Sequence, residues 1–161
     1  MSITTTVLEE KIDKKAVAAV LNKILETELA GVVRYTHYSL MIYGYNRIPI
    51  VSWLRNQASE SLAHAQQAGE LITGLGEHPS LAIGPLLETH NHDIGAILRE
   101  SLEHEMTGLA AYRELLSLVE GRSIVLEEYA RQMIHDEELH IMEVNKMLRK
   151  PGEIAAFQNG Q

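Results

Sequence analysis

The chain has 161 residues, 45% of them hydrophobic and 22% charged, with 4 Pro and 11 Gly, which indicates one globular domain and excludes low-complexity or largely disordered chains. Its 22 acidic and 14 basic side chains give a net charge of −8, which argues against binding nucleic acid or an anionic membrane surface. Because Cys is absent, disulfides, iron–sulfur clusters and thiolate zinc sites are excluded, and any metal must bind through His, Asp or Glu.

Apolar residues at helical spacing predict four long helices, at about 14–44, 49–75, 88–119 and 124–149. Asp13, Pro49 and Ser123 are the expected starting residues. Pro49 suits the first helical position because an N–H group there would have no partner within the helix. Ser123 can cap the free N–H groups of the turn that follows it. No segment alternates with a period of two, so we predict an all-α fold. The bundle occupies residues 16–150, between an N-terminal extension, 1–15, and a C-terminal tail, 151–161.

The connections between these helices differ in length. Gly44–Ile48 and Glu120–Ser123 are short, so the first two helices and the last two should each pair antiparallel. Leu75–Leu87 can span about 40 Å at roughly 3.3 Å per residue, the length of a whole helix. We therefore predict a four-helix bundle of two antiparallel hairpins joined by a long crossover, which the spacing permits but does not prove over a simple up-down-up-down order.

No targeting or membrane segment is evident. The first 30 residues lack a basic start followed by an apolar run, and no stretch of about 18 apolar residues occurs anywhere. A cytoplasmic location is expected.

Carboxylates and imidazoles interrupt the apolar stripe of each predicted helix near its midpoint. Glu28 interrupts the first stripe, Glu105 the third, and Glu137 with His140 the fourth. In the second helix, His64 lies on either of two overlapping stripes, and Glu60 lies on one of them. Because all the interruptions fall near helix centres, they share one layer of the bundle whatever its topology.

Such a layer needs positive charge. An unpaired buried carboxylate costs several kcal/mol, and neighbouring carboxylates also repel one another. Four core Glu residues carry a charge of −4, Lys and Arg avoid the stripes, and two Fe²⁺ or similar ions would bring +4. Glu and neutral imidazole suit iron, manganese or zinc. Glu137-Glu138-Leu139-His140 also has the Glu-x-x-His spacing of di-iron carboxylate bundles. The layer therefore predicts a paired-metal site.

Several other polar residues lie beside these stripes. His37, His104 and His135 are expected at the surface or the rim of the bundle. The cluster Thr89–Asp93 could bind a metal weakly, but we expect it to open the third helix instead.

Two tyrosines follow the core carboxylates. Tyr35 and Tyr112 each lie seven residues after a core Glu, and hence on the same helical face. Either could donate an electron to an oxidised metal, and Tyr35 is our candidate catalytic residue. Plain core packing is the alternative role for both.

The order of these motifs resembles the bacterioferritin branch of the ferritin-like di-iron superfamily. The similar segments are Leu21–Leu29, Tyr35, His64-Ala65, Leu98-Arg99 with Glu105, and Asp136–His140, within residues 21–149. The resemblance implies that Glu28, His64, Glu105, Glu137 and His140 are metal ligands, with Glu137 bridging both ions and Glu105 also bridging or nearly so. The sequence does not show which of these two carboxylates bridges.

Three positions depart from the family pattern. The family's second-helix carboxylate corresponds to Ser61, and Glu60, one residue earlier, is the candidate replacement because it lies four residues before His64 on one helical face. The family's haem-binding Met corresponds to Leu62, which argues against haem. Only nine residues follow Pro151-Gly152, too few for the family's fifth helix, so a dimer becomes a credible alternative to a 24-subunit cage.

The expected function is that of a ferroxidase that binds two iron ions per chain. Its partners would be Fe²⁺, O₂ or peroxide, and further copies of the chain in a homo-oligomer, at least a dimer. Iron storage or detoxification would follow from this activity. Two alternatives remain: a di-iron oxygenase or peroxidase, and a metal-free helical dimer that keeps a degenerate site.

Overall fold

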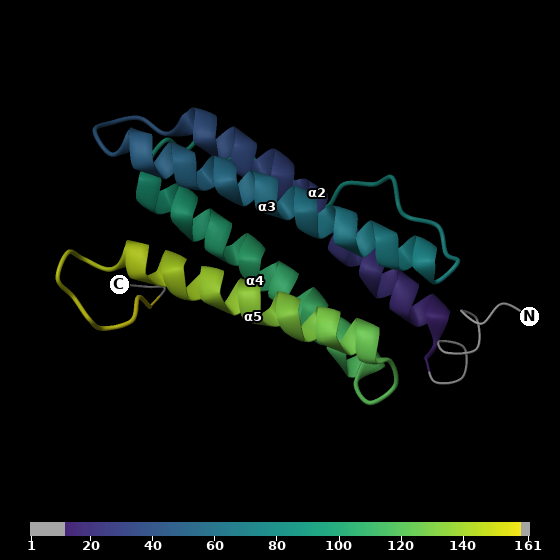
Figure 1. Ribbon diagram of the computed structural model, residues 1–161. Coiled ribbons are helices and arrows are strands. Elements are labelled where there is room, and N and C mark those ends of the chain that lie inside the picture. Colours follow the sequence, from purple (N-terminus) through teal and green to yellow (C-terminus); the bar gives the residue numbers. More distant parts are fainter. Residues whose placement is uncertain (1–11, 159–161) are drawn as a thin grey trace, which may run out of the picture.

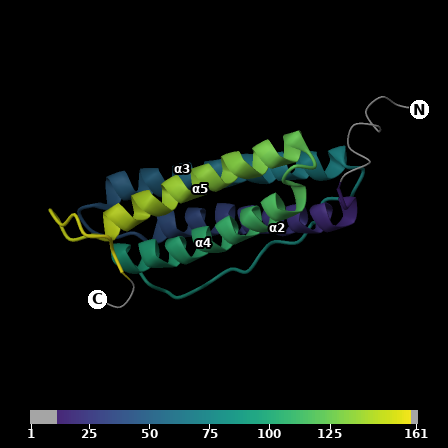
Figure 2. The same ribbon diagram turned by 90° about the horizontal axis from the view of Figure 1, so that it is seen from below.

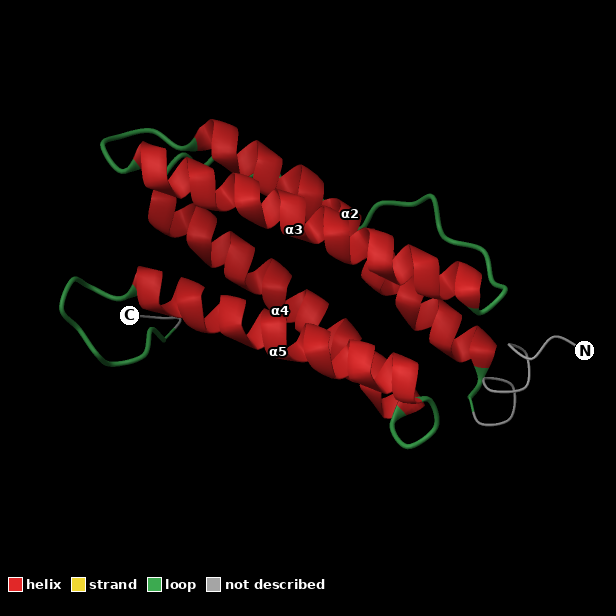
Figure 3. Cartoon of the chain, viewed as in Figure 1, coloured by secondary structure: helices red, strands yellow, loops and turns green. Residues whose placement is uncertain are grey.

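The computed structural model describes residues 12–158, and within them the chain is built from four helices and no strand. The helices are α2 (Lys14–Met41), α3 (Arg47–Gly74), α4 (Ile94–Val119) and α5 (Ile124–Leu148). They lie side by side in one bundle, connected only by loops and turns (Figures 1 and 3). The prediction of an all-α four-helix bundle is confirmed. Residues 1–11 of the predicted extension and 159–161 of the predicted tail lie outside the described residues.

The topology is two antiparallel hairpins joined by a crossover. In Figure 1, α3 ends at one end of the bundle and α4 begins at the other, so these two helices run in the same direction. The long connection between them runs along the bundle (Figure 2). It is held to α2, since Gly84 N–H donates to the Glu26 carbonyl at 2.8 Å and Ser80 N–H donates to Asn22 Oδ1 at 2.6 Å. The predicted hairpins and crossover are thus both present.

Side-chain caps fix the start of three helices. Asp13 Oδ1 accepts from Lys15 and Ala16 N–H at 3.1 Å at the start of α2, and Ser123 Oγ accepts from Leu126 N–H at 3.4 Å at the start of α5, as predicted. The third helix begins at Ile94 and not at 88, because Asp93 Oδ2 caps Ala96 N–H at 2.8 Å. His90, just before this cap, has φ of 56°, which lies outside helical geometry.

Two other predicted boundaries shift. The second helix begins at Arg47, two residues before Pro49, which sits inside the first turn where its missing N–H is still harmless. The first helix ends at Met41 and not at 44, because Ile42 is extended and its carbonyl accepts from the Arg47 guanidinium.

The apolar core is divided along the bundle. One cluster, which includes Leu21, Ile72, Leu115 and Leu126, lies toward the end where α5 begins. Two smaller clusters, one around Tyr38, Leu54 and Ile97 and one around Leu102 and Val144, lie toward the other end. The buried carboxylates fall between these clusters in sequence on every helix that carries one. None of the helices between residues 12 and 158 is both long and apolar enough to cross a membrane.

Candidate metal centre

A polar layer occupies the middle of the bundle, and all four described helices contribute to it. Glu28 comes from α2, His64 from α3, Glu105 from α4, and Glu137 with His140 from α5. The first four side chains are buried, Glu137 with only 4% of its surface exposed, and His140 is half-buried. Each replaces an apolar residue in a core-facing stripe, which is why the helices bring them together.

These five side chains form two groups that share one carboxylate. Glu28, His64 and Glu137 each offer a ligand atom within 4.8 Å of the others, and Glu105, Glu137 and His140 do the same. His64 Nδ1 lies 3.4 Å from Glu28 Oε1 and 3.8 Å from Glu137 Oε1. An ion about 2.1 Å from each ligand atom separates those atoms by roughly 3 to 4 Å. The donor set and its spacing therefore fit a pair of metal ions next to a common Glu137.

The tyrosines connect the two halves of the layer. Tyr112 OH donates to Glu28 Oε1 at 2.6 Å, and Tyr35 OH donates to Glu105 Oε1. Each tyrosine follows one core Glu by seven residues but bonds to the other Glu, so the α2–α3 and α4–α5 hairpins are related by an approximate two-fold arrangement. Both carboxylates are thereby held in position by a buried hydroxyl.

Glu60 lies at the rim of the layer and belongs to neither group. Its Oε1 is 3.3 Å from His140 Nε2, while His140 Nδ1 faces Glu105 Oε2 at 3.9 Å. Its side chain is 40% exposed, against 8% for Glu105. A carboxylate on the outer nitrogen of a metal-binding histidine fixes the orientation and tautomer of the ring. The geometry therefore favours an orienting role for Glu60, and its assignment as a ligand stays a prediction.

Burial and crowding shift the titration of the layer. Burial raises the pKa of Glu105 to about 6, and burial together with the hydrogen bond and charge of Glu105 raises the pKa of Glu137 well above its usual range. Burial lowers the pKa of His64, but the hydrogen bond and charge of Glu28 outweigh it, so that pKa is raised overall. The charges of neighbouring carboxylates contribute to all three shifts, and cations bound in the layer would offset those charges.

His104 and Arg34 adjoin the layer, although sequence reasoning placed His104 at the surface or the rim and did not consider Arg34. Arg34 Nη1 donates to His104 Nδ1 at 3.4 Å, and both side chains are half-buried. Burial, and then the charge of Arg34, lower the pKa of His104 to about 4, so its imidazole is neutral at pH 7. The available signal for His104 was Gly31 on the core stripe, because a Cβ atom at that position would lie only 3.1 Å from His104 Nε2.

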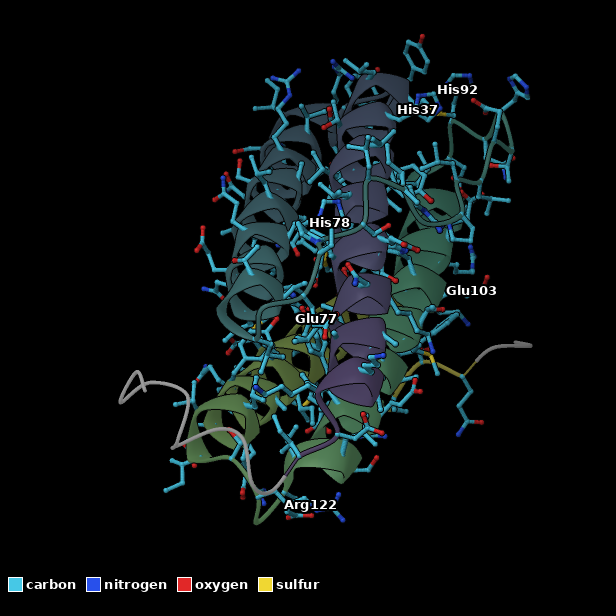
Figure 4. The ribbon with its side chains drawn as sticks, turned by 90° about the vertical axis from the view of Figure 1, so that its right-hand side faces the viewer. His37, Glu77, His78, His92, Glu103 and Arg122 are labelled. Atoms are coloured by element: carbon cyan, nitrogen blue, oxygen red, sulfur yellow. The ribbon has the colours of Figure 1, made fainter. Side chains whose placement is uncertain are left out.

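The remaining histidine candidates lie away from the layer. His37 Nε2 faces Glu88 at 3.1 Å with 42% of its side chain exposed, and His135 pairs with Asp136 with 65% exposed. His37 and His92 lie together at one end of the bundle (Figure 4). Residues 89–92 of the predicted cluster precede α4. Only Asp93, the last residue of that cluster, caps the start of the helix.

Comparison with known proteins places this geometry in context. The model of the ferritin-like domain family matches residues 18–153. Among curated proteins, none is similar enough to count as a match. Several solved structures share the fold at low sequence identity.

A ferritin-like, diiron-carboxylate protein from Bacillus anthracis aligns with a TM-score of 0.78 at 21% identity, covering 92% of this chain and 100% of that one. A dodecameric thioferritin, the bacterioferritin-related protein of Bacteroides fragilis, aligns with a TM-score of 0.81 at 21% identity, over 90% and 91% of the two chains. The bacterioferritin of Rhodobacter capsulatus, described with a metal-free dinuclear site and haem iron, aligns with a TM-score of 0.76 at 24% identity, over 86% of each chain.

Proposed function

Because this chain belongs to the ferritin-like domain family, we propose that it binds Fe²⁺ at the central polar layer, two ions per chain, and oxidises it. The proposed ligands are Glu28 and His64 on one ion, Glu105 and His140 on the other, and Glu137 shared by both. One observation carries the proposal: three buried carboxylates and two imidazoles converge, in two groups, where packing alone would place apolar side chains.

The donor set suits the oxidation of iron. Anionic oxygen ligands stabilise Fe³⁺ more than Fe²⁺, which makes loss of an electron easier. Two Fe²⁺ ions together give up two electrons, which with two protons reduce O₂ to H₂O₂, or H₂O₂ to two molecules of water. Glu28 and Glu105 would be held for this task by the hydroxyls of Tyr112 and Tyr35.

Tyr35 is the proposed source of a further electron. Its hydroxyl donates directly to the ligand Glu105, and its ring is buried with 2% of its surface exposed. A tyrosine in this place would be able to supply one electron for the reduction of O₂ or peroxide, and its hydroxyl proton would move to the Glu105 carboxylate.

The alternative of an oxygenase or peroxidase acting on an organic substrate is less well supported. Such an enzyme needs a pocket that opens on the metals. Two cavities reach the layer, and each has a volume of only about 10 Å³. Two larger pockets contain none of the proposed ligands. One is lined by Arg47 and nearby residues of α3, and the other is lined mainly by residues of α2 and α3, including Leu25 and Leu62. Small reactants such as O₂ and peroxide fit this description better.

Anaerobic titration with Fe²⁺, followed by exposure to air, tests the proposal. We expect saturation near two ions per chain and then an absorbance rise from Fe³⁺. Glu137→Ala should lose most of the binding, whereas Glu138→Ala, which changes an exposed residue paired with Arg113, should keep it. The metal-free alternative would be favoured if the parent protein bound no iron and Glu137→Ala raised its free energy of unfolding.

We also propose that the chain forms a homo-oligomer, at least a dimer. The thioferritin with the same fold is described as dodecameric. Large apolar side chains are exposed on the first hairpin and the crossover: Val33, Leu40, Leu62, Leu81, Ile83 and Leu86. We expect light scattering to give a mass of at least two chains, which Leu62→Glu should lower and Ile124→Glu, an exposed apolar site on α5, should leave unchanged. The cytoplasmic location remains a prediction from the sequence.

A further inference from the structure

A second set of metal-binding side chains lies at the surface, outside the polar layer. His37, on α2 near one end of the bundle (Figure 4), faces Glu88 of the crossover, with His37 Nε2 at 3.1 Å from Glu88 Oε2. On the other side of the same carboxylate, His90 Nδ1 lies 3.7 Å from Glu88 Oε1. Two imidazoles therefore flank one carboxylate, each beside a different oxygen.

The contact between His37 and Glu88 is close but poorly directed for a hydrogen bond. His37 Nε2 is itself buried, and it has no partner with hydrogen-bond geometry in the part of the chain that the structure describes. Buried polar atoms of this kind are rare in native proteins, and a bound water or ion is one explanation for them.

The spacing of these two atoms fits an ion. Two ligand atoms that are each about 2.1 Å from one ion lie roughly 3 to 4 Å apart, and each points at the ion and not at the other ligand. A separation of 3.1 Å without a well-directed bond, as between His37 and Glu88, has both properties.

The backbone turns the second imidazole back toward Glu88. His90 has φ of 56°, in the left-handed region that residues other than glycine seldom adopt. Its N–H donates to Glu88 Oε1 at 2.8 Å, which holds the turn. The His90 side chain is 86% exposed, so it has room to rotate toward an ion beside the carboxylate. An uncommon backbone conformation that places a side chain in this way points to a role for that side chain.

Other contacts hold the segment that follows Glu88. Thr89 Oγ1 donates to Glu100 Oε1 of α4 at 2.6 Å. His92 Nδ1 donates to the Met41 carbonyl of α2 at 2.8 Å. The segment is thus tied to both helices, and little reordering is needed for it to bind an ion.

We propose that His37, Glu88 and His90 bind one divalent transition-metal ion at the surface of the bundle. Two imidazoles and a carboxylate suit ions such as Zn²⁺ and Co²⁺, and solvent would complete the coordination. The site shares no residue with the two ligand groups of the polar layer, so it goes beyond the proposed function and does not depend on it. Only His37 and Glu88 already stand at ligand spacing, so this site should be weaker than the layer and fill after it.

Co²⁺ is the probe, because it takes the same ligands as Zn²⁺, reports them by visible absorption and is stable in air. The protein is dialysed against rising concentrations of Co²⁺, and the ions bound per chain are counted. We expect two ions in the layer and a third at higher concentration. His37→Ala and Glu88→Gln should each lose the third ion and keep the first two. His78→Ala, which removes an exposed histidine at the start of the same crossover, should keep all three.

His90→Gly tests the third ligand without disturbing the turn, because glycine adopts a positive φ readily. It should raise the dissociation constant of the third ion at least about tenfold. An unchanged dissociation constant would overturn the assignment of His90.

Proteolysis gives a readout that does not count ions. An ion at this site would join the end of the crossover to α2, and the exposed Leu86 and Leu87 directly precede Glu88. Co²⁺ at the concentration that fills the third site should slow chymotrypsin cleavage after these leucines in the parent protein. This protection should be lost in His37→Ala. Equal protection in the two proteins would overturn the link between the crossover and α2.

The outcomes separate this site from the proposed metal pair. Equal numbers of bound ions in the parent protein, His37→Ala and Glu88→Gln would overturn the surface site, as would the same loss in His78→Ala. A parent protein that binds a single Co²⁺, lost in His37→Ala and in Glu88→Gln, would support the surface site and overturn the metal pair of the layer.

Discussion

Glu137 differs from the other acidic residues of the centre because both candidate ligand groups contain it. Glu28 and Glu105 each belong to one group, and each is bonded to a tyrosine from the other hairpin. Glu137 faces Glu105 and Glu28 across the layer, and its pKa is raised by burial first and by those neighbours next. Its removal should therefore affect the centre more than the removal of either partner.

Stoichiometry can measure this difference. We expect Glu105→Gln to keep one Co²⁺ at near-normal affinity and to lose the other, because the group of Glu28, His64 and Glu137 stays intact. Glu137→Gln should lower the binding affinity for both ions, each by tenfold or more, which is the usual scale for such a loss at a metal site. Calorimetric titration distinguishes the two patterns, with Glu138→Gln as the control. Equal losses in Glu105→Gln and Glu137→Gln would contradict the sharing.

The hydroxyl of Tyr112 should stabilise the metal-free protein through Glu28. A hydrogen bond to a buried carboxylate contributes about 2 kcal/mol. We expect Tyr112→Phe to lower the free energy of unfolding by that amount in urea, while Tyr43→Phe, at a side chain 67% exposed, changes it by less than about 0.5 kcal/mol. An equal effect of the two substitutions would mean that the bond contributes nothing.

At the scale of elements, apolar spacing predicted the helices well and their ends less well. Asp13 and Ser123 were recognisable because each directly precedes an apolar stripe. The start of α4 was placed too early because several residues of Thr89–Asp93 can cap a helix, and the structure uses the last of them, Asp93. Spacing alone does not reveal which of several polar residues caps a helix.

The crossover is fastened to α2 at a close approach that only a glycine permits. A Cβ atom on Gly84 would lie 2.9 Å from the Glu26 carbonyl oxygen, which also accepts the Gly84 N–H. We expect Gly84→Ala to cost about 1 to 3 kcal/mol and to expose the crossover to proteases. Gly69→Ala, inside α3 with no atom within 4 Å of the added Cβ, should instead stabilise the protein by about 0.5 to 1 kcal/mol. Urea unfolding and limited proteolysis would show both effects.

At the scale of the molecule, the polar layer lies between apolar clusters that stabilise the bundle around it. The sequence predicted this layer because Glu28, Glu105 and Glu137 interrupt otherwise apolar stripes at helix midpoints. It did not predict on which side of His140 Glu60 lies. It also did not predict that Arg34 and His104 reach the layer. Both features depend on how the helices are rotated and on how closely they approach at Gly31. Distances of this kind are set by packing between helices and leave no periodic signal.

Assembly of these carboxylates makes the stability of the metal-free protein depend on pH in an unusual direction. Glu105 and Glu137 have raised pKa values in the folded state, so the folded protein holds protons that the unfolded chain has already lost above the ordinary Glu pKa of 4.5. The stabilising contribution is then present at low pH and is lost as pH rises. His64, whose pKa is also raised, acts in the same direction, while the lowered pKa of His104 acts oppositely, chiefly below its ordinary value of 6.5.

We therefore expect the free energy of unfolding of the metal-free protein to fall between pH 7 and 9, by about 1 kcal/mol per pH unit, which is close to the limit for one linked proton. With saturating Co²⁺ the sign should reverse, because the ions bind the deprotonated carboxylates and stabilise the folded state more as pH rises. Glu137→Gln should make the unfolding free energy of the metal-free protein depend less on pH, since it removes the carboxyl group whose pKa is raised most. Urea unfolding at three pH values, with and without metal, checks all three slopes. A metal-free protein that grew more stable over this range would show that its central carboxylates are ionised without any cation beside them.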